Sequence, residues 1–552
     1  MTKTKPMTPG DELLFCALGG SGEIGMNVNL YGCRGKWLMV DLGMTFSGTE
    51  YPGVDLVFAD LDFIEERRAD LLGIVLTHAH EDHIGAVPYF AAELGVPLYA
   101  TPFTARLVRE KLEEARIAGE VDLRVIDHLD NFDIGPFGIR YVPLAHSIAE
   151  GNALVIETPH GRIFHTGDWK LDVEPLVGTP ATAAELTALG DEGVLALVCD
   201  STNVFNQKPS GSEGEVRRAL IEEVGRHKGR RVLVTTFASN VARLETLGEV
   251  AKANGRRLCV AGRSLDRIIR TGQASGYLKE LPDMIDADTA MDLPRGQVLI
   301  VATGGQGEPR AALGRISEGN HPISLESGDV VLFSSRQIPG NEIPIGRIQN
   351  KLAEMGVTIV TDRQAEIHVS GHPGRPELEA MYSWIRPQVL VPVHGEMRHM
   401  REQARVGRLA GIGQTVVQKN GDLVRLAPGK PGKFAEVRAG RLVLDGDIIA
   451  PADGLAMVMR RRMAANGLVT VAIGGKGQVQ VAGVGLPIDE DYDDFVSEAI
   501  EDVRAAVAKL KGGMRHDAAA ITEAARLAAR RAAQRWSGKK PQVQVMLMEL
   551  AP

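Results

Sequence analysis

The chain has 552 residues, which is too long for one ordinary hydrophobic core and predicts about three domains. Its composition, 44% hydrophobic and 24% charged, is that of a soluble globular protein. The formal net charge of −9 argues against a nucleic-acid partner, because such proteins more often carry a positive balance. Residues 221–275 nevertheless hold eleven Lys or Arg and five Asp or Glu, so this segment forms either a local basic surface or an ordinary solvated face.

The four cysteines lie in apolar runs without C-x-x-C spacing, which predicts buried small side chains and excludes a disulfide framework or a cysteine zinc site. The apolar run at residues 13–18 is too short for a signal peptide and follows two acidic residues. No apolar stretch is long enough to span a membrane. We therefore expect a cytoplasmic protein without a membrane partner.

Residues 13–198 contain short apolar strands separated by glycine turns, with helices expected over residues 84–94 and 102–118. Because several strands follow one another with little helix between them, this region predicts a layered α+β architecture. From residue 214 to 361 the pattern changes to α/β. Helices expected over residues 215–227, 242–254 and 264–271 alternate with apolar strands, which predicts βαβ units and a parallel sheet.

Strand-rich sequence resumes at residues 366–426, so the parallel-sheet region is expected to be an insertion. Residues 429–450 resemble a connector, and the last hundred residues predict a small α+β unit. Its expected elements are a strand at 468–473, helices at 491–510 and 517–536, and a strand at 543–550. The expected divisions are residues 1–213 and 366–450 for one domain, 214–365 for the insertion and 451–552 for the C-terminal domain.

The segment from Gly73 to Gly85, GIVLTHAHEDHIG, concentrates potential metal ligands directly after an apolar strand. Alternate residues of an extended chain point the same way, so His78 and His80 can bind one metal together. Asp82 and His83 follow as the chain turns into a helix and can face a second metal. Four potential ligands in six residues are far denser than the isolated histidines of an ordinary surface.

A two-metal site needs more ligands, and single His or Asp residues follow three later apolar runs: His146, Asp168 and His394. Mixed imidazole and carboxylate ligation suits zinc, with manganese or magnesium as substitutes. Asp41 has the same placement, and we expect it to orient a ligand histidine rather than to bind metal; a strand-capping carboxylate is the alternative. The remaining histidines considered lack this context and are expected to be structural or exposed: His128, His160, His165 and His399.

The pattern H-x-H-x-D-H followed by isolated His, Asp and His resembles the metallo-β-lactamase superfamily, and the inserted βαβ region resembles its β-CASP nucleases. Three further motifs fit that subgroup: CDST with Asp200, VSGH with His372 and VHGE with His394. In that subgroup, histidine in the last motif goes with RNA substrates and valine with DNA. The segments GGSGEIGMN, TGGQGEP and SSRQIPGNE resemble segments of the bacterial ribonuclease J family. Together with the order of the domains, the resemblance to that family covers essentially the whole chain.

This resemblance implies an αββα sandwich with an inserted β-CASP parallel-sheet domain and a small C-terminal domain. It implies one metal on His78, His80 and His146, a second on Asp82, His83 and His394, and Asp168 as the bridge. It also implies that the two cations would activate a water for attack on the phosphodiester. Asp82 then serves catalysis as well as metal binding, and His372, held charged by Asp200, is the candidate general acid.

Candidate substrate-binding residues lie in a second group of loops. Gly-rich and polar loops offer backbone N–H groups to phosphates, and His368 lies four residues before His372; a solvent-facing strand residue is its alternative. The expected substrate-binding set is His368, Ser370, Gly304, Gly305, Gln306, Gly307, Ser334, Ser335, Arg336 and Asn341.

The family implies single-stranded, 5′-monophosphorylated RNA as substrate and both 5′→3′ exonuclease and endonuclease activity. It also implies roles in messenger RNA turnover and ribosomal RNA maturation, alongside other RNA-decay proteins.

Three other functions compete with this prediction. A thioesterase, lactonase or β-lactamase of the same superfamily is disfavoured by the insertion and its motifs. A DNA nuclease is disfavoured by His394, and an inactive RNA-binding scaffold by the complete ligand set. For residues 451–552, an acidic helix, a basic helix and an apolar terminal strand predict self-association into a homodimer or larger homo-oligomer, with a monomeric appendage as the alternative.

Overall fold

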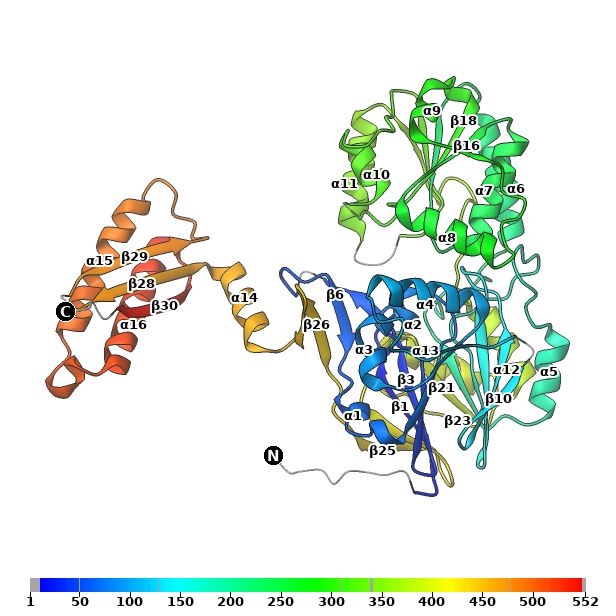
Figure 1. Ribbon diagram of the computed structural model, residues 1–552, viewed down its shortest axis with the longest axis horizontal. Coiled ribbons are helices and arrows are strands. Elements are labelled where there is room, and N and C mark those ends of the chain that lie inside the picture. Colours follow the sequence, from blue (N-terminus) through cyan, green and yellow to red (C-terminus); the bar gives the residue numbers. More distant parts are fainter. Residues whose placement is uncertain are drawn as a thin grey trace. The chain divides into compact units, whose positions relative to one another are not determined.

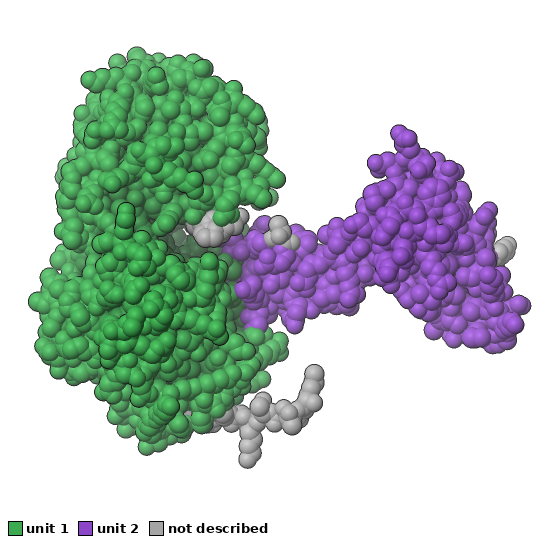
Figure 2. Space-filling model, turned by 180° about the vertical axis from the view of Figure 1, so that it is seen from behind, with its two compact units in different colours: residues 1–45, 58–439 green, residues 46–57, 440–552 purple. Residues whose placement is uncertain are grey.

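The computed structural model of the chain describes residues 10–48, 50–128, 130–308, 310–337, 341–475 and 477–548. The chain divides into two compact units, residues 1–45 with 58–439 and residues 46–57 with 440–552, coloured separately in Figure 2. In the part of the chain that the structure describes, no helix is long and apolar enough to cross a membrane.

Two sheets of the first unit pack face to face (Figure 1). The first has the order β25-β24-β1-β3-β4-β7-β8-β9 and the second the order β10-β11-β12-β13-β14-β21-β23. The strands of the first sheet are β1 (Leu13–Gly19), β3 (Val28–Cys33), β4 (Lys36–Val40), β7 (Leu71–Val75), β8 (Leu98–Ala100), β9 (Leu123–Val125), β24 (Asp422–Ala427) and β25 (Gly432–Glu436). Those of the second are β10 (Asn131–Ile134), β11 (Phe137–Pro143), β12 (Asn152–Thr158), β13 (Gly161–His165), β14 (Ala196–Asp200), β21 (Val389–Val393) and β23 (Gln414–Thr415).

The core between these sheets is made by the inward side chains of both. Phe15 and Tyr31 of the first sheet and Tyr141 and Val198 of the second are buried in one cluster. Helices cover the outer faces: α3 (Val87–Leu94) and α4 (Pro102–Glu114) over the first sheet, and α5 (Ala183–Asp191), α12 (Arg375–Ile385) and α13 (Met397–Leu409) over the second. This layering confirms the expected αββα sandwich.

Between β14 and β21 the chain forms a separate sheet whose six strands are all parallel, as the alternating pattern predicts (Figure 1). Its order is β17-β16-β18-β15-β19-β20, with β15 (Val232–Thr235), β16 (Arg257–Ala261), β17 (Met284–Ile285), β18 (Val298–Ala302), β19 (Val330–Phe333) and β20 (Thr358–Val360). Helices α6 (Glu213–Arg226) and α7 (Val241–Ala253) lie on one face, and α10 (Ala312–Ser317) and α11 (Glu342–Glu354) on the other. Helix α8 (Arg263–Ala274) follows β16, and α9 (Ala287–Asp292) follows β17.

A buried ion pair fixes the start of this inserted domain. Arg243 of α7 is fully buried and binds Glu213, the first residue of α6, with Nη2 3.0 Å from Oε2. The same guanidinium donates to the backbone oxygens of Ser334 and Ile367 at 2.9 and 3.1 Å. One side chain therefore joins the insertion's first two helices to the loop after β19 and to the returning chain.

The second unit contains a three-stranded sheet in the order β29-β28-β30, in which β28 pairs antiparallel with β29 and parallel with β30. Its strands are β28 (Leu468–Gly474), β29 (Val479–Val484) and β30 (Gln542–Met548), preceded by α14 (Leu455–Asn466). Helices α15 (Tyr492–Ala508) and α16 (Ala518–Ser537) bury alanine and valine side chains against the sheet. Phe495, Val503 and Ala529 lie at the centre of this core.

Most predicted elements exist close to their expected bounds, and the four cysteines are buried and free, as predicted. Residues 429–450 differ from the expected connector, because they contain β25, β26 (Arg441–Asp445) and the start of β27 (Ile448–Pro451). Helices α12, α13 and α14 and strand β29 were not predicted. Residues 549 and 550, expected at the end of the last strand, lie outside the described residues.

The ion pair of Arg243 and Glu213 generates a stability prediction. Changing Glu213→Gln leaves a buried guanidinium without its counter-charge, so we expect the free energy of unfolding to fall by about 3 kcal/mol. The matched control is Glu222→Gln, which breaks an exposed pair with Arg226 and should cost less than about 1 kcal/mol. Urea unfolding followed by fluorescence compares the two variants; equal midpoints would contradict the structural role of the buried pair.

Candidate metal centre

The histidine-rich loop leaves the carboxyl end of β7. The chain passes through Thr77, places His78 and His80 in extended backbone, and enters the short helix α2 (Glu81–Ile84) with His80 as its N-terminal cap. Asp82 and His83 therefore lie in the first turn of α2, on a different side of the site from His78. This geometry agrees with the expected division of the motif between two metals.

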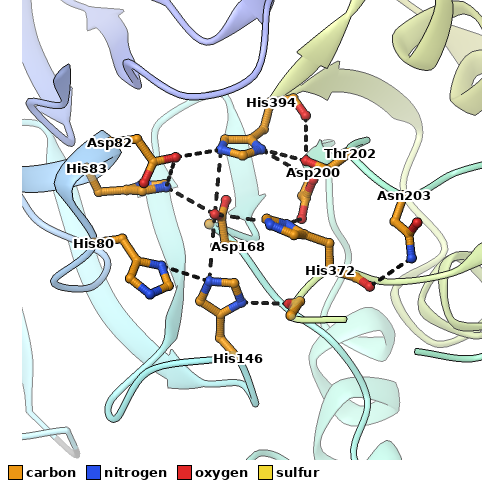
Figure 3. A network of polar contacts seen from close by, with 12 residues as sticks. His80, Asp82, His83, His146, Asp168, Asp200, Thr202, Asn203, His372 and His394 are labelled. Carbon is orange, nitrogen blue, oxygen red and sulfur yellow. Dashed lines mark hydrogen bonds and ion pairs between the residues drawn. The ribbon is translucent and has the colours of Figure 1, made fainter. Parts of the chain in front are cut away.

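The first ligand cluster contains three imidazoles whose ring nitrogens converge, and Figure 3 labels two of them, His80 and His146. His80 Nδ1 lies 3.1 Å from His78 Nε2 and 3.0 Å from His146 Nε2. His146 comes from the loop after β11. A single cation placed between these three nitrogens could therefore contact all three rings.

The second cluster lies on the other side of Asp168 and contains Asp82, His83 and His394 (Figure 3). Asp82 Oδ2 is 3.1 Å from His394 Nε2 and 3.7 Å from His83 Nε2. His394 directly follows β21. The segment after β7 thus delivers two ligands of this cluster, and the end of β21, distant in sequence, delivers the third.

Asp168 joins the two clusters through a single oxygen. Its Oδ2 is 3.2 Å from His83 Nε2 and 3.5 Å from His394 Nε2, and it is also 3.8 Å from His146 Nε2. His78 Nε2 completes the set at 4.0 Å. The carboxylate is 3% exposed, so the positive partners that it needs must come from this centre.

His372 and Asp200 form a third group beside the second cluster. His372 Nδ1 lies 2.7 Å from Asp200 Oδ2 and 4.0 Å from Asp168 Oδ2. Asp200 is fully buried at the end of β14. Ser370 accepts a hydrogen bond from the backbone N–H of His372 at 3.1 Å, which makes Ser370 part of the turn that presents this ring.

Outer partners bind the second nitrogen of most ligand rings and so fix their orientation. Asp41 Oδ2 lies 2.7 Å from His83 Nδ1, the orienting contact expected for this residue. Thr202 Oγ1 lies 2.6 Å from His394 Nδ1, and His146 Nδ1 donates to Gly371 O at 2.6 Å. His80 Nε2 is 3.1 Å from Ser239 Oγ, a residue of the inserted domain. Neither Thr202 nor Ser239 was predicted, since isolated hydroxyl residues carry no sequence signal.

The glycine-rich segment GGSGEIGMN contacts the histidine-rich loop at Asp82 and His83. Asn27 donates its backbone N–H to Asp82 O at 2.8 Å, and its amide Nδ2 lies 3.1 Å from His83 Nε2. A Cβ at Gly43 would lie 1.8 Å from Asp82 O, so only glycine permits this approach. Asn27 was missed as a site residue, although the segment itself was quoted as a family motif.

Two site residues adopt left-handed backbone conformations that favour glycine. Asp41 has φ 65° and His394 has φ 50°. Such conformations are uncommon outside glycine and persist when surrounding contacts determine them. Here those contacts are the ones that aim Asp41 at His83 and His394 at Asp82.

The electrostatics differ between the two clusters. Burial lowers the pKa of His78 and His146 well below the usual value and that of His80 to about 4, so these three rings are neutral, which is the form that binds metal. Burial also opposes charge on His394, but Asp168, Asp82 and Asp200 outweigh it and raise the pKa of His394 to about 9. Asp168 and Asp41 likewise raise the pKa of His83 against the effect of burial.

The expected substrate loops follow the carboxyl ends of neighbouring parallel strands, where ligands of such sheets usually bind. Gly304–Gly307 follow β18, and Ser334 and Ser335 follow β19. A Cβ at Gly305 would lie 2.5 Å from Ser335 Oγ, so the loops touch. Gln306 Nε2 donates to Arg336 O at 2.8 Å, and Asn341 Nδ2 contacts Gln306 Oε1 at 3.4 Å. Residues 338–340 of this loop lie outside the described residues.

Two of the expected substrate residues have distinct surroundings. The Ser334 hydroxyl donates to Ile367 O at 2.6 Å and also contacts Arg243, so it is occupied within the protein. His368 lies in a loop and not in a strand, and its Nδ1 is buried without a hydrogen-bond partner among the described residues. Burial lowers the pKa of His368, and nearby Arg243 and Arg336 lower it further, so the ring is neutral. The solvent-facing strand alternative for His368 is therefore wrong.

The histidines expected to be structural or exposed lie outside the three ligand clusters. His165 is buried against Tyr31, with Nδ1 2.8 Å from Oη, and His399 packs on Phe205. His128 lies near Glu150, and His160 near Asp11.

The basic segment 221–275 is largely used within the protein, because six of its cations bind carboxylates or backbone oxygens: Arg226, Arg231, Arg243, Lys252, Arg256 and Arg267.

The donor set fits divalent cations. Each cluster offers imidazole nitrogens with at least one carboxylate, and ligand atoms within each cluster lie within 4.8 Å of one another. Imidazole with carboxylate ligation is typical of zinc and is tolerated by manganese. The buried Asp168 and Asp82 carboxylates supply the negative charge that such ions require.

Four family models match successive parts of the chain. They are the metallo-beta-lactamase superfamily over residues 25–192, the ribonuclease J beta-CASP domain over 229–352, the Zn-dependent metallo-hydrolase RNA specificity domain over 357–417 and the ribonuclease J C-terminal domain over 455–550. The matches follow the expected order of domains from one end of the chain to the other.

Proteins named ribonuclease J are similar to this chain over nearly its full length. The protein of Sinorhizobium meliloti is 40% identical over 99% of this chain and 98% of its own. That of Mycolicibacterium smegmatis is 36% identical over 98% and 97%, and that of Thermus thermophilus 36% identical over 85% and 84%. A solved structure of a protein of unknown function from Enterococcus faecalis has a TM-score of 0.54 at 18% identity, covering 75% of this chain and 100% of its own, and shows the fold alone.

The unequal charge of the two clusters predicts pH-dependent metal binding. With a pKa of about 9, His394 is protonated at neutral pH and must release its proton before it binds a cation. The affinity of the cluster with Asp82 and His83 should therefore fall as the pH is lowered below about 9, while His80 stays neutral down to about pH 4. Zinc titration calorimetry in two buffers of different ionisation enthalpy measures the released protons. Identical heats would contradict the prediction, and His394→Gln should reduce the release.

Proposed function

The chain belongs to the ribonuclease J family, and on that premise we propose how its residues carry out the metal-dependent hydrolysis of RNA. The observation that carries the proposal is the pair of ligand clusters joined by Asp168, with His372 beside them. The metal ligands lie in loops, or in the short helix α2, directly after strands of the sandwich, and His372 lies in the loop before α12.

We propose that His78, His80 and His146 hold one divalent cation and that Asp82, His83 and His394 hold the other, with Asp168 between them. Zinc suits this donor set best. When bound, the cations would supply charge stabilisation for the phosphodiester and activation of the attacking water. The protein's own part is to keep the rings oriented through Asp41, Thr202 and Gly371 and, in the first cluster, to keep the imidazoles neutral by burial.

His372 is the proposed general acid for the departing oxygen of the cleaved bond. Burial opposes charge on this ring, but the Asp200 carboxylate outweighs it and raises the pKa of His372, which favours the protonated form that a general acid needs. Because Asp200 engages Nδ1, Nε2 is the nitrogen that can donate to a substrate oxygen. Asp200 therefore both charges the ring and fixes its orientation.

Changing His372→Ala should lower kcat by about 10²–10⁴-fold, the usual contribution of general acid catalysis. Metal content should remain that of the unaltered enzyme, because His372 lies outside both ligand clusters that we assign. Asp200→Asn should shift the basic limb of the pH–rate profile to lower pH, since the carboxylate that raises the pKa is lost. Elemental analysis measures the metal content of each variant, and RNA cleavage assays at several pH values measure kcat. Loss of metal from His372→Ala would show that this ring is a metal ligand.

The substrate should reach this centre along the carboxyl edge of the inserted sheet. The loop containing Ser239 leaves the same edge and contacts His80, which brings the edge to the metal centre. The backbone N–H groups of Gln306 and Gly307 already donate to Glu308 Oε2 and Gly304 O. Contacts to phosphate would therefore come from the N–H groups of Gly304 and Gly305 and from the hydroxyl of Ser335, whose Oγ has no hydrogen-bond partner among the described residues. Arg336 and Asn341 would add positive charge and an amide donor, with His368 and Ser370 on the chain leading to His372.

We propose that this site takes single-stranded RNA with a 5′-monophosphate and works both as a 5′→3′ exonuclease and as an endonuclease. The matching RNA specificity domain supports an RNA substrate. The proposed setting is the cytoplasm, in messenger RNA turnover and ribosomal RNA maturation with other RNA-decay proteins. Relatives named ribonuclease J that are similar over nearly the full chain length support this proposal.

End-labelled RNA tests this activity directly. We expect a 5′-monophosphorylated strand to be degraded stepwise, a 5′-triphosphorylated strand to be cut only internally, and both reactions to stop after metal removal by a chelator. Added zinc or manganese should restore them. Turnover of a small ester or β-lactam with no RNA cleavage would favour another hydrolase of the superfamily, and cleavage of DNA alone would favour a DNA nuclease.

We also propose that the C-terminal unit drives self-association. Strand β30 is at an edge of its sheet, and its side chains Met546, Leu547 and Met548 are exposed. An apolar edge strand is an obvious site for pairing with a second copy. A homodimer or larger homo-oligomer would cover it.

A chain that ends after Pro451 lacks this edge, so light scattering should give the mass of a monomer while the metal content of the remaining domains is retained. Leu547→Lys in the full chain is the milder test, because a charge at the edge disfavours strand pairing. If both proteins keep the mass of the unaltered oligomer, the interface lies elsewhere.

A further inference from the structure

The C-terminal unit contains a pocket whose lining is basic. It lies between α14, α16 and the turn into β30 and has a volume of about 470 Å³. Its lining residues are Arg462, Asn466, Arg526, Arg530, Lys540, Pro541, Gln542 and Val543. Four of these eight are cationic and none is acidic, so the pocket concentrates positive charge on a chain whose net charge is negative.

The positive charge of this pocket is mostly left uncompensated, in contrast with its surroundings. Arg535 on the same helix binds Glu498 and Asp502, and Arg526 at the pocket's rim binds Glu523 with Nη2 2.6 Å from Oε1. For Arg462, Arg530 and Lys540, no ion pair exists within the part of the chain that the structure describes. Three cations therefore converge on one concavity without a carboxylate of their own.

Arg530 gives the pocket a fixed donor. Its Nε is buried and has no hydrogen-bond acceptor among the residues described. A buried donor without an acceptor is costly, and a bound anion would remove that cost. Arg526 and Arg530 lie four residues apart on α16, and Arg462 and Asn466 four apart on α14, so each helix directs a pair of donors toward the same space.

The lining favours phosphate groups over an acidic protein segment. Interfaces between proteins usually bury apolar or aromatic anchors at their centre, whereas this pocket offers only Pro541 and Val543 as apolar residues. Guanidinium groups match the geometry of phosphate oxygens. No aromatic side chain lines the pocket to stack on bases, and its four cations favour the charged phosphates, so we expect the contacts to be mainly to the backbone.

We propose that this pocket, which we name the C-terminal anion pocket, is a second binding site for the phosphate backbone of the RNA substrate. The inference rests on the proposed ribonuclease function and extends it to a contact outside the metal centre. Its consequence is that long strands bind more tightly than strands that can occupy only one site. Binding through backbone phosphates should also be strongly weakened by salt.

The test compares three metal-loaded, full-length proteins: the unaltered chain, Arg462→Gln/Arg530→Gln, and the control Arg504→Gln/Lys509→Gln. The control removes two exposed charges outside the pocket, one within α15 and one at the residue that follows it. The ligand is a fluorescent single-stranded RNA of about 30 nucleotides with phosphorothioate linkages, which retain the backbone charge and resist hydrolysis, and a second of about five nucleotides. Fluorescence anisotropy gives the Kd at several salt concentrations.

We expect the pocket variant to bind the long RNA about 10-fold more weakly, with a slope of log Kd against log salt that is shallower by about 1.4, the value for two lost phosphate contacts on a single strand. Binding of the short RNA should not change, and the control should resemble the unaltered chain. Lys540→Gln should act in the same direction with a smaller effect, and Arg530→Lys should retain part of the affinity.

Equal affinities and slopes for the long RNA in all three proteins would overturn the proposal. So would a pocket variant that changes the oligomer mass in light scattering but not the RNA affinity, because the pocket would then bind a protein segment. Failure of the proposed nuclease function has a different signature, since unmodified RNA would remain uncut by the unaltered enzyme. The anisotropy result decides the pocket in either case.

Discussion

The structure of the catalytic centre depends on one buried carboxylate. Asp168 is almost without exposure, and its Oδ2 lies within 4.0 Å of ring nitrogens from His78, His83, His146 and His394. A carboxylate in such a position must be balanced by positive charge, because otherwise it would take up a proton and become neutral. In the protein alone that balance comes from protonated His83 and His394, whose pKa values the surrounding carboxylates raise. Divalent cations provide the same balance more completely, so the centre is built for them.

The two packed sheets stabilise the fold that holds these charged groups close together. They bury large apolar side chains between them and leave their strand ends to carry polar loops, so that ligands from β7, β11, β13 and β21 meet at one place. The inserted domain then completes the centre from the other side. Its Ser239 reaches His80, and Arg243 fastens the loop after β19 to the chain that leads to His372. The loop after β19 and the potential metal ligands are thus joined within one unit.

The sequence predicts the part of the site that is local. His78 to His83 are adjacent, and His146, Asp168 and His394 each follow an apolar run, so their residue types and positions are informative in themselves. Asn27, Thr202 and Ser239 are ordinary polar residues, and only the fold brings them to the ligand rings. The elements follow this distinction only in part. Helix α14, whose sequence mixes methionines with a run of arginines, was not predicted, but neither was α12, although its buried Leu378, Met381 and Ile385 form an apolar stripe. The anion pocket needs α14 and α16 together and could not be predicted from either segment.

The metal content of purified variants tests the central claim most directly. If Asp168 joins two cation sites, the unaltered protein should contain about two divalent ions per chain, His146→Ala and His394→Ala about one each, and Asp168→Ala fewer than either. Elemental analysis after equilibration with zinc gives these values, with circular dichroism to verify folding. One ion in the unaltered protein, or two retained in Asp168→Ala, would contradict the account of a centre built around this carboxylate.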